Sequence, residues 1–379
     1  MARVSVQPAL LQWARDRSGL PADIVHSKFP KLGAWESGDA QPTLKQLETF
    51  ARVTRTPLGM LFLPEPPNLE LPIPDFRTVG NEAVSAPSPE LLDTIYAMQR
   101  RQQWLREYLI ESDSDSLPFV GSIDIAADPI EIAATIRDTL NIGNDWANQV
   151  PTWSDALRAL RSSIEESGIF PVLNGVVGNN THRKLDPQEF RGFTLIDEFA
   201  PLIFVNGADA KGAQMFTFAH ELAHLWIGAE GVSNLKDTLP VDTEIETFCN
   251  KVAAEFLIPA SELEAVWDGV RHAAEPFQQL ARRFKVSPIV AARRAWDLSL
   301  ITHAAFFEFY EAYEEDDRRV RTKRPDGGDF YATQNTRVGK RFARIVNRAA
   351  KEGRLLYRDA YDLTGLGGAT FDQYIKSLE

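Results

Sequence analysis

The chain has 379 residues, enough for two or three domains that each bury a core. Apolar residues make up 44% and charged residues 25%, as in folded globular proteins, which excludes extensive disorder and a fibrous architecture. The net charge of -12 argues against a protein coated in nucleic acid. The longest apolar run, residues 199–205, is too short to span a membrane, and charges at 15–17 interrupt any N-terminal signal sequence. We therefore expect a cytoplasmic protein with no membrane contact. Its single cysteine, Cys249, excludes an intrachain disulfide and fits a reducing compartment.

The N-terminal third divides into a helical domain and a linker. Residues 7–63 read as short helices separated by proline and glycine turn signals, which predicts a small helical domain over 1–63. Seven of the 23 prolines fall within residues 64–89, so regular helix is excluded there and an extended linker is favoured. Apolar spacing then predicts a long amphipathic helix over 89–111, and we group residues 64–127 as linker and helix.

The middle of the chain changes from helical to strand periodicity and back. Two helices are predicted over 128–140 and 153–167, the first capped by Asp128. Residues rich in β-branched and aromatic side chains predict strands over 169–177, 193–197 and 202–206, the last two as a hairpin. The helical period returns after Gly207. We therefore predict an α+β, mostly helical fold, with one domain over 128–310 and a basic helical region over 311–379.

A metal-binding motif lies at the start of this returning helical region. His220, Glu221 and His224 form the pattern HExxH inside an apolar segment that predicts a buried helix. Residues four apart on a helix are neighbours on one face, which is the spacing that two imidazoles need to bind one zinc ion. Two core histidines satisfied by hydrogen bonds are the alternative. The pairing on a buried helix favours zinc as the cofactor.

A catalytic zinc needs a third protein ligand, and helical position selects among the glutamates of residues 242–259. An apolar stripe from Ile245 to Leu257 defines the buried face of this predicted helix. Glu246 lies at the edge of that face, about 70° from its centre, whereas Glu255 lies about 110° away. We therefore predict Glu246 as the third ligand and keep Glu255 as its rival. Asn250, one turn on, could orient Glu246 or simply make an ordinary helix hydrogen bond, and Cys249 is expected to be a small buried apolar residue.

The motif also supplies a candidate general base. Glu221 cannot point at the metal together with both histidines, so we predict that it takes a proton from the attacking water. Peptide hydrolysis is the reaction that this arrangement serves. The strand at 202–206 is a candidate edge to which an extended polypeptide adds, or simply part of the core. His182 is a further candidate donor to the developing oxyanion.

The residues around the motif resemble a known family. The segment HELAH, with APLIFVNG before it and EIETFCNKVAAEFLIP after it, is similar to the ImmA/IrrE zinc metallopeptidases over roughly residues 150–300. The resemblance implies that Glu246 is the third zinc ligand. It also implies a substrate class, because members cleave DNA-binding repressors in phage-related or stress responses.

The N-terminal region resembles an XRE-type helix-turn-helix, with Trp35-Glu36-Ser37-Gly38 followed by Pro42-Thr43. The stretch 26–32 is shorter than the turn and start of a recognition helix would be. A helical interaction module therefore stands beside DNA binding as a prediction. For DNA, the candidate contacts are Ser27, Lys28 and Lys31.

Positive charge is concentrated near the C-terminus. Residues 318–358 carry 13 Lys and Arg against 3 Asp and Glu, and Arg341, Arg344, Arg348 and Lys351 recur at helical spacing. A solvated helix face is the default interpretation, with nucleic acid or an acidic protein as alternatives. The rival function for the whole chain is a non-cleaving regulator or antitoxin-like protein that binds DNA and a partner toxin around a structural zinc. A second copy of the chain is a further candidate partner.

Overall fold

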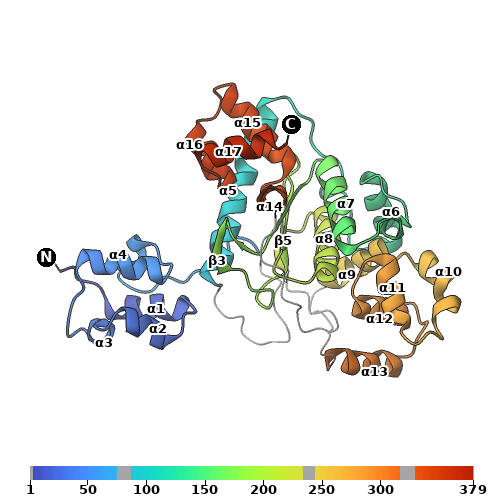
Figure 1. Ribbon diagram of the computed structural model, residues 1–379, viewed down its shortest axis with the longest axis horizontal. Coiled ribbons are helices and arrows are strands. Elements are labelled where there is room, and N and C mark those ends of the chain that lie inside the picture. Colours follow the sequence, from blue (N-terminus) through green and yellow to red (C-terminus); the bar gives the residue numbers. More distant parts are fainter. Residues whose placement is uncertain (1–2, 75–86, 234–243, 316–328, 379) are drawn as a thin grey trace. The chain divides into compact units, whose positions relative to one another are not determined.

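The computed structural model describes residues 3–74, 87–233, 244–315 and 329–378. The chain forms two compact units (Figure 1). The first comprises residues 1–72 and 83–96, and the second comprises 73–82 and 97–379. Helices dominate both units, and two small sheets lie in the second, as an α+β fold requires. None of the described helices combines the length and apolar character needed to cross a membrane.

The first unit consists of short helices around one apolar core. They are α1 (Pro8–Arg17), α2 (Ala22–Lys28), α3 (Leu32–Glu36), α4 (Leu44–Val53) and the 3-10 helix η1 (Leu58–Phe62). Its aromatic centre consists of Phe29, Trp35 and Phe50. The ring centroid of Phe29 lies 6.1 Å from that of Trp35 and 5.4 Å from that of Phe50. Helix α4 begins with a full capping box, in which the Thr43 hydroxyl accepts from the Gln46 N–H and the Gln46 side chain accepts from the Thr43 N–H.

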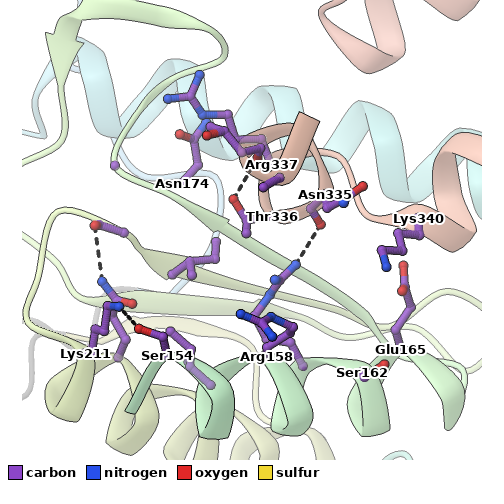
Figure 2. A pocket seen from close by; sticks show the side chains of 18 of the residues that line it. Ser154, Arg158, Ser162, Glu165, Asn174, Lys211, Asn335, Thr336, Arg337 and Lys340 are labelled. Carbon is purple, nitrogen blue, oxygen red and sulfur yellow. Dashed lines mark hydrogen bonds between the residues drawn. The ribbon is translucent and has the colours of Figure 1, made fainter. Parts of the chain in front are cut away.

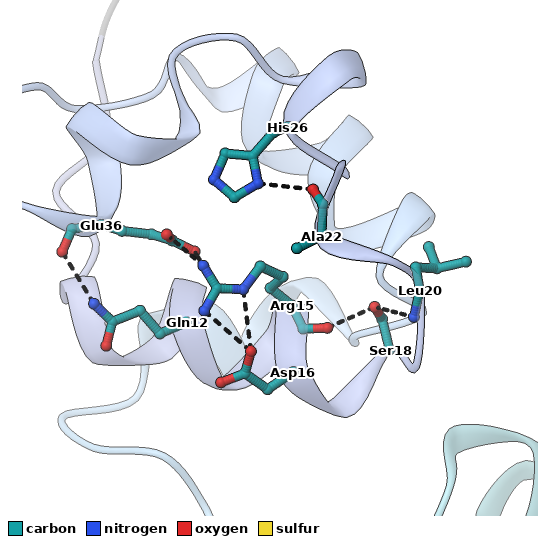
Figure 3. Close-up of polar contacts among 8 residues, drawn as sticks. All are labelled: Gln12, Arg15, Asp16, Ser18, Leu20, Ala22, His26 and Glu36. Carbon is teal, nitrogen blue, oxygen red and sulfur yellow. Dashed lines mark hydrogen bonds and ion pairs between the residues drawn. The ribbon is translucent and has the colours of Figure 1, made fainter. Parts of the chain in front are cut away.

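Polar contacts tie α1 to the end of α3 within this unit (Figure 3). The Arg15 guanidinium lies 2.6 Å from a Glu36 carboxylate oxygen, and the Gln12 amide donates to the Glu36 carbonyl. Helix α2 ends at Lys28 and α3 begins at Leu32, and α3 has only five residues. After η1, residues 63–74 form no helix, as their prolines predicted, and the rest of the predicted linker up to 86 lies outside the described residues.

The larger sheet of the second unit has four strands in the order β1, β5, β4, β6. They are β1 (Phe170–Asn174), β4 (Gly192–Leu195), β5 (Leu202–Asn206) and β6 (Gly231–Ser233). The predicted hairpin is confirmed, because β4 pairs antiparallel with β5. The edge position proposed for 202–206 is wrong: β5 lies between β1 and β4 and is buried throughout. Both of its backbone edges are already paired, so no polypeptide can add there.

The strand predicted over 169–177 is divided at Gly175. β1 ends at Asn174, and β2 (Val176–Val177) pairs instead with β3 (Asn180–Lys184) in a separate two-stranded sheet. A Cβ atom at Gly175 would lie 2.7 Å from the backbone nitrogen of Ala208, so the strand ends at a close backbone approach that only glycine permits. Sequence periodicity did not predict β3 or β6, because β3 is polar and β6 has three residues.

Helices surround this sheet. The central ones are α8 (Lys211–Ile227), which packs on β4 and β5, and α9 (Glu244–Leu257), which packs along α8. The predicted helices at 128–140 and 153–167 are present as α6 (Pro129–Thr139), capped by Asp128, and α7 (Trp153–Glu166). The remaining elements of this layer are η2 (Trp146–Gln149), α10 (Ala260–Val270), α11 (Pro276–Phe284), α12 (Pro288–Asp297) and α13 (His303–Glu314).

The C-terminal helices pack against the same unit. They are α14 (Phe330–Arg337), α15 (Lys340–Lys351), α16 (Tyr357–Thr364) and α17 (Gly368–Lys376), and the second half of α5 (Pro89–Glu111) joins them. Arg101 of α5 donates to the carbonyls of Leu363 and Arg337, and burial lowers its pKa to about 10. Phe342 of α15 stacks on Phe170 of β1 with centroids 4.7 Å apart. The basic side chains of α15 lie on its exposed face, opposite this packing.

Candidate metal centre

Helix α8, which carries the two histidines, has an apolar sequence on nearly every face. Residues 217–226 are all buried, which places the motif in the core rather than on a solvated surface. The helix ends at Gly228, whose φ of 70° is the left-handed conformation that glycine favours at this position. His220 and His224 are one turn apart, with ring centroids separated by 4.7 Å.

Glu246 of α9 completes a compact group of three potential ligands. Its carboxylate oxygens lie 3.1 Å from His220 Nε2 and 3.0 Å from His224 Nε2. The two Nε2 atoms are 2.9 Å apart. Tetrahedral zinc with nitrogen and oxygen ligands near 2.0–2.1 Å separates neighbouring ligand atoms by about 3.3 Å. The three donors therefore match the spacing and the chemistry of a zinc site, and they form the one such group among the described residues.

Asn250 lies behind this group, where its side chain contacts His220 and not Glu246, the ligand that it was expected to orient. Its side-chain oxygen is 3.0 Å from His220 Nδ1. An amide oxygen only accepts, so His220 Nδ1 is the donor in this contact, and in the neutral ring the Nε2 lone pair is the one available to a metal. This is the arrangement by which a hydrogen bond on one ring nitrogen fixes the tautomer that can bind a metal through the other.

The rival carboxylate has a different role. Glu255 is buried at the far end of α9, where it pairs with Arg294 of α12 and accepts from the Ala260 N–H at 3.3 Å. Arg137 and Arg294 also donate to the carbonyls of Glu255 and Ile258 at the C-terminal end of this helix. Glu255 thus stabilises the packing of α9, and it is not part of the histidine group.

The electrostatics of the centre keep Glu246 ionised. Burial raises the pKa of this carboxyl, but the two facing imidazoles lower it by more, and the net result lies well below the usual range. Cys249 is buried one turn along α9, as expected for a small apolar residue. Burial, and then the charges of Glu246 and Glu221, raise the pKa of its thiol well above the ordinary value.

Glu221 is held against the sheet by residues that the sequence analysis did not identify. The Thr194 hydroxyl of β4 donates to a Glu221 carboxylate oxygen at 2.7 Å. A Cβ at Gly192 would lie 2.8 Å from the other oxygen and 2.6 Å from the Thr217 methyl group. Glycine at 192 therefore lets β4 approach the helix closely enough for this contact. A glycine inside a strand pattern is a recognised signal for such an approach.

The remaining predicted site residues lie elsewhere. His182 is exposed on β3, whereas the histidine pair and Glu246 are buried, so the structure does not bring it into the centre. In the first unit, Ser27 and Lys28 are exposed at the end of α2, and Lys31 is exposed at the start of α3.

Comparison with known proteins identifies two segments. No curated protein matches the chain. Residues 338–377, which include α15 to α17, match a domain of unknown function, DUF8813. Residues 176–295 match the IrrE N-terminal-like domain of the Peptidase M78 family, and this segment contains every residue of the buried centre. Residues 176–295 are thus an IrrE N-terminal-like metallopeptidase domain that carries a buried His220, His224 and Glu246 group.

Proposed function

We propose that this protein is a zinc-dependent endopeptidase that acts on a protein substrate. His220, His224 and Glu246 would hold the zinc, and Glu221 would be the general base. A DNA-binding transcriptional repressor is the substrate that the family resemblance suggests, in a phage-related or stress response. The position of Glu221 carries this proposal, because an oriented, buried carboxylate directly follows the first ligand of a three-donor site.

The chemistry follows from the residues in place. A bound zinc would act as a Lewis acid that makes a water more acidic and polarises the scissile carbonyl. Glu221 would accept the proton from this water at its carboxylate and later donate it to the leaving amine. Thr194 would keep the carboxylate oriented through its hydroxyl, and Asn250 would hold His220 in the ligating tautomer.

Burial of the centre supports a second candidate function. His220, His224, Glu221 and Glu246 are each at most 2% exposed, so a peptide reaches them only if neighbouring residues move. Structural zinc sites are closed in this way, which favours a non-cleaving regulator or antitoxin-like protein with a structural zinc. Structural sites normally supply four protein ligands, however, and the described residues supply three. Among the described residues the site thus has the ligand number of a catalytic zinc, which makes the peptidase our first choice.

One experiment separates the two candidates without a known substrate. The zinc-loaded protein and its Glu221→Gln variant are incubated with a cell extract, and new protein N-termini are identified by mass spectrometry. We expect new termini with the unmodified protein only, while both proteins retain about one zinc per chain. Glu244→Gln is the matched control, because Glu244 is exposed two residues before Glu246. New termini with Glu221→Gln would refute the assigned base, and none with either protein would favour the structural zinc.

We also propose that the first unit binds DNA as an XRE-like module, with a helical interaction module for a protein partner as the alternative. Exposed Ser27, Lys28 and Lys31 support phosphate contact, although α3 is short for reading bases. Replacing Lys28 and Lys31 with alanine should weaken binding to duplex DNA of every sequence. The slope of the logarithm of the binding constant against the logarithm of the salt concentration should become less steep by about one for each phosphate contact removed. Lys45→Ala on α4 is the exposed control. Duplex binding that is the same in all these variants would refute these contacts, and no duplex binding by the unmodified protein would leave the protein-partner alternative.

A further inference from the structure

A second candidate site lies in the same unit as the metal centre but shares none of its residues. It is a cavity of about 550 Å³. Its walls come from α7, the end of β1, the start of α8, and α14 with the first residue of α15 (Figure 2). This volume is within the range of small-molecule sites.

The backbone at this cavity has the geometry of a ligand site. β1 and β5 are parallel, and the cavity lies at their carboxyl ends, where open sheets with parallel strands generally bind ligands. Gly175 and Gly207 line it, and a Cβ on either would lie within 3.0 Å of the other strand's backbone. Helix α8 starts here at Lys211 with no side-chain cap, so its positive dipole end adds to the local field.

Five cationic side chains line the cavity, where they outnumber the two carboxylates of its lining. They are Arg158, Arg161, Lys211, Arg337 and Lys340. Only Arg158 has an ion-pair partner among the described residues, at 3.2 Å from Asp155. The two carboxylates in the lining, Glu165 and Asp329, accept from the backbone N–H groups of Arg341 and Tyr331. The cavity therefore concentrates positive charge in a chain whose net charge is -12.

Of these five cations, Arg161 has the least favourable surroundings for its charge. Its Nη2 donates to the Asn335 carbonyl at 2.9 Å, and its Nε is buried with no hydrogen-bond partner in the described part of the chain. Burial lowers its pKa to about 10, and the nearby charge of Glu165 only partly offsets this. A guanidinium whose buried Nε lacks an acceptor is stabilised when an anion supplies one.

We propose that this cavity binds a compact, multiply charged anion that carries phosphoryl groups, such as a small phosphorylated metabolite. Phosphoryl oxygens match the donors of Arg161, Arg337, Lys211 and Lys340. The described lining contains no aromatic ring on which a nucleobase could stack, which favours a ligand without one. The depth of Arg161 favours a small molecule over a nucleic acid backbone, which would reach the exposed Arg158 first.

Occupancy of the cavity would link the C-terminal helices to the metallopeptidase domain. The ligand would bridge Arg337 and Lys340 to Lys211, and Lys211 is on the helix that carries His220 and His224. It would also relieve the repulsion among the cations that face one another without it. The native state with ligand bound should therefore unfold at a higher temperature than the free protein.

The test is calorimetric titration of the full chain with inorganic pyrophosphate and with inorganic phosphate. We expect saturable binding of pyrophosphate that is tighter than that of phosphate. Lys211→Ala and Lys340→Ala should each weaken it roughly tenfold to a hundredfold, as loss of a charge-assisted hydrogen bond predicts. Both side chains are exposed, so these variants should fold. Arg348→Ala, an exposed arginine on α15 outside the cavity, should bind as the unmodified protein does.

Two further arms distinguish this cavity from the metal centre and from a nucleic acid site. Glu246→Ala should bind pyrophosphate normally, so loss of binding in that variant would assign the anion to the metal centre and overturn the proposal. Displacement of pyrophosphate by single-stranded DNA, with the same dependence on Lys211 and Lys340, would assign the cavity to nucleic acid and overturn it as well. No binding at millimolar pyrophosphate, or equal binding by all variants, would also overturn it.

Discussion

The two ends of α9 each bury a glutamate, and the comparison shows what decides the role of a buried carboxylate. Glu246 faces two imidazoles from one neighbouring helix, and Glu255 faces a guanidinium from another. A neutral imidazole can take up either a proton or a metal ion, so the positive charge that faces Glu246 can come from outside the protein. Arginine always carries its own charge. Glu255 is therefore in a fixed ion pair, and Glu246 belongs to a group that can take up an external cation.

The largest expected effect is on folding stability at the Glu255 end. Glu255→Ala leaves Arg294 buried without its carboxylate, which should cost about 3–5 kcal/mol of unfolding free energy. Denaturant unfolding measures this cost. Replacing Glu255 and Arg294 together with leucine should recover most of it, because no buried charge then remains. A loss in the double variant that equals the sum of the losses in the two single variants would show that the two residues act separately.

At the other end, the effect should appear in metal binding rather than in folding. Glu246→Ala should weaken zinc affinity by more than about a hundredfold, since loss of an orienting contact behind a ligand already costs 10–100-fold. Zinc competition with a fluorescent chelator measures the affinity, and Glu244→Gln, at an exposed position on the same helix, is the matched control. Unchanged zinc affinity in Glu246→Ala would refute its assignment as a ligand.

A smaller effect is expected one turn along from Glu246. Asn250→Ala removes the acceptor of His220 Nδ1 and should weaken zinc binding by about 10–100-fold without abolishing it. Asn250→Asp keeps an acceptor and should retain most of the affinity. If the alanine and aspartate variants lose equal affinity, the orienting role of Asn250 is wrong.

The smallest effect is expected at Cys249, which lies between Glu246 and Glu255 in the sequence of α9. The raised pKa of its thiol keeps it protonated at pH 8, so alkylation of the native protein should be much slower than alkylation of the unfolded chain. The rate of iodoacetamide labelling, followed by mass spectrometry, reports local opening of α9. Zinc should slow labelling further, and Glu255→Ala should accelerate it. Native labelling at the unfolded rate would contradict the burial of this residue.

Much of the centre could be predicted from the sequence because it depends on one helix at a time. The four-residue spacing of His220 and His224 placed both on one face, and the apolar stripe of residues 245–257 selected Glu246 over Glu255. The orientation of Glu221 could not be predicted in this way. It depends on Thr194 and Gly192 of β4, and the periodicity of α8 does not indicate which strand packs against that helix.

Sequence by itself determined the helical N-terminal unit, the β4 and β5 hairpin and the buried group of His220, His224 and Glu246, because each follows from local periodicity and turn chemistry. Only the tertiary structure decided that β5 is an interior strand, since its second neighbour, β1, is distant in the sequence. The same holds for the cationic cavity. Its residues extend from 154 to 340, and they form one site because α14 packs on β1 beside α7 and the start of α8.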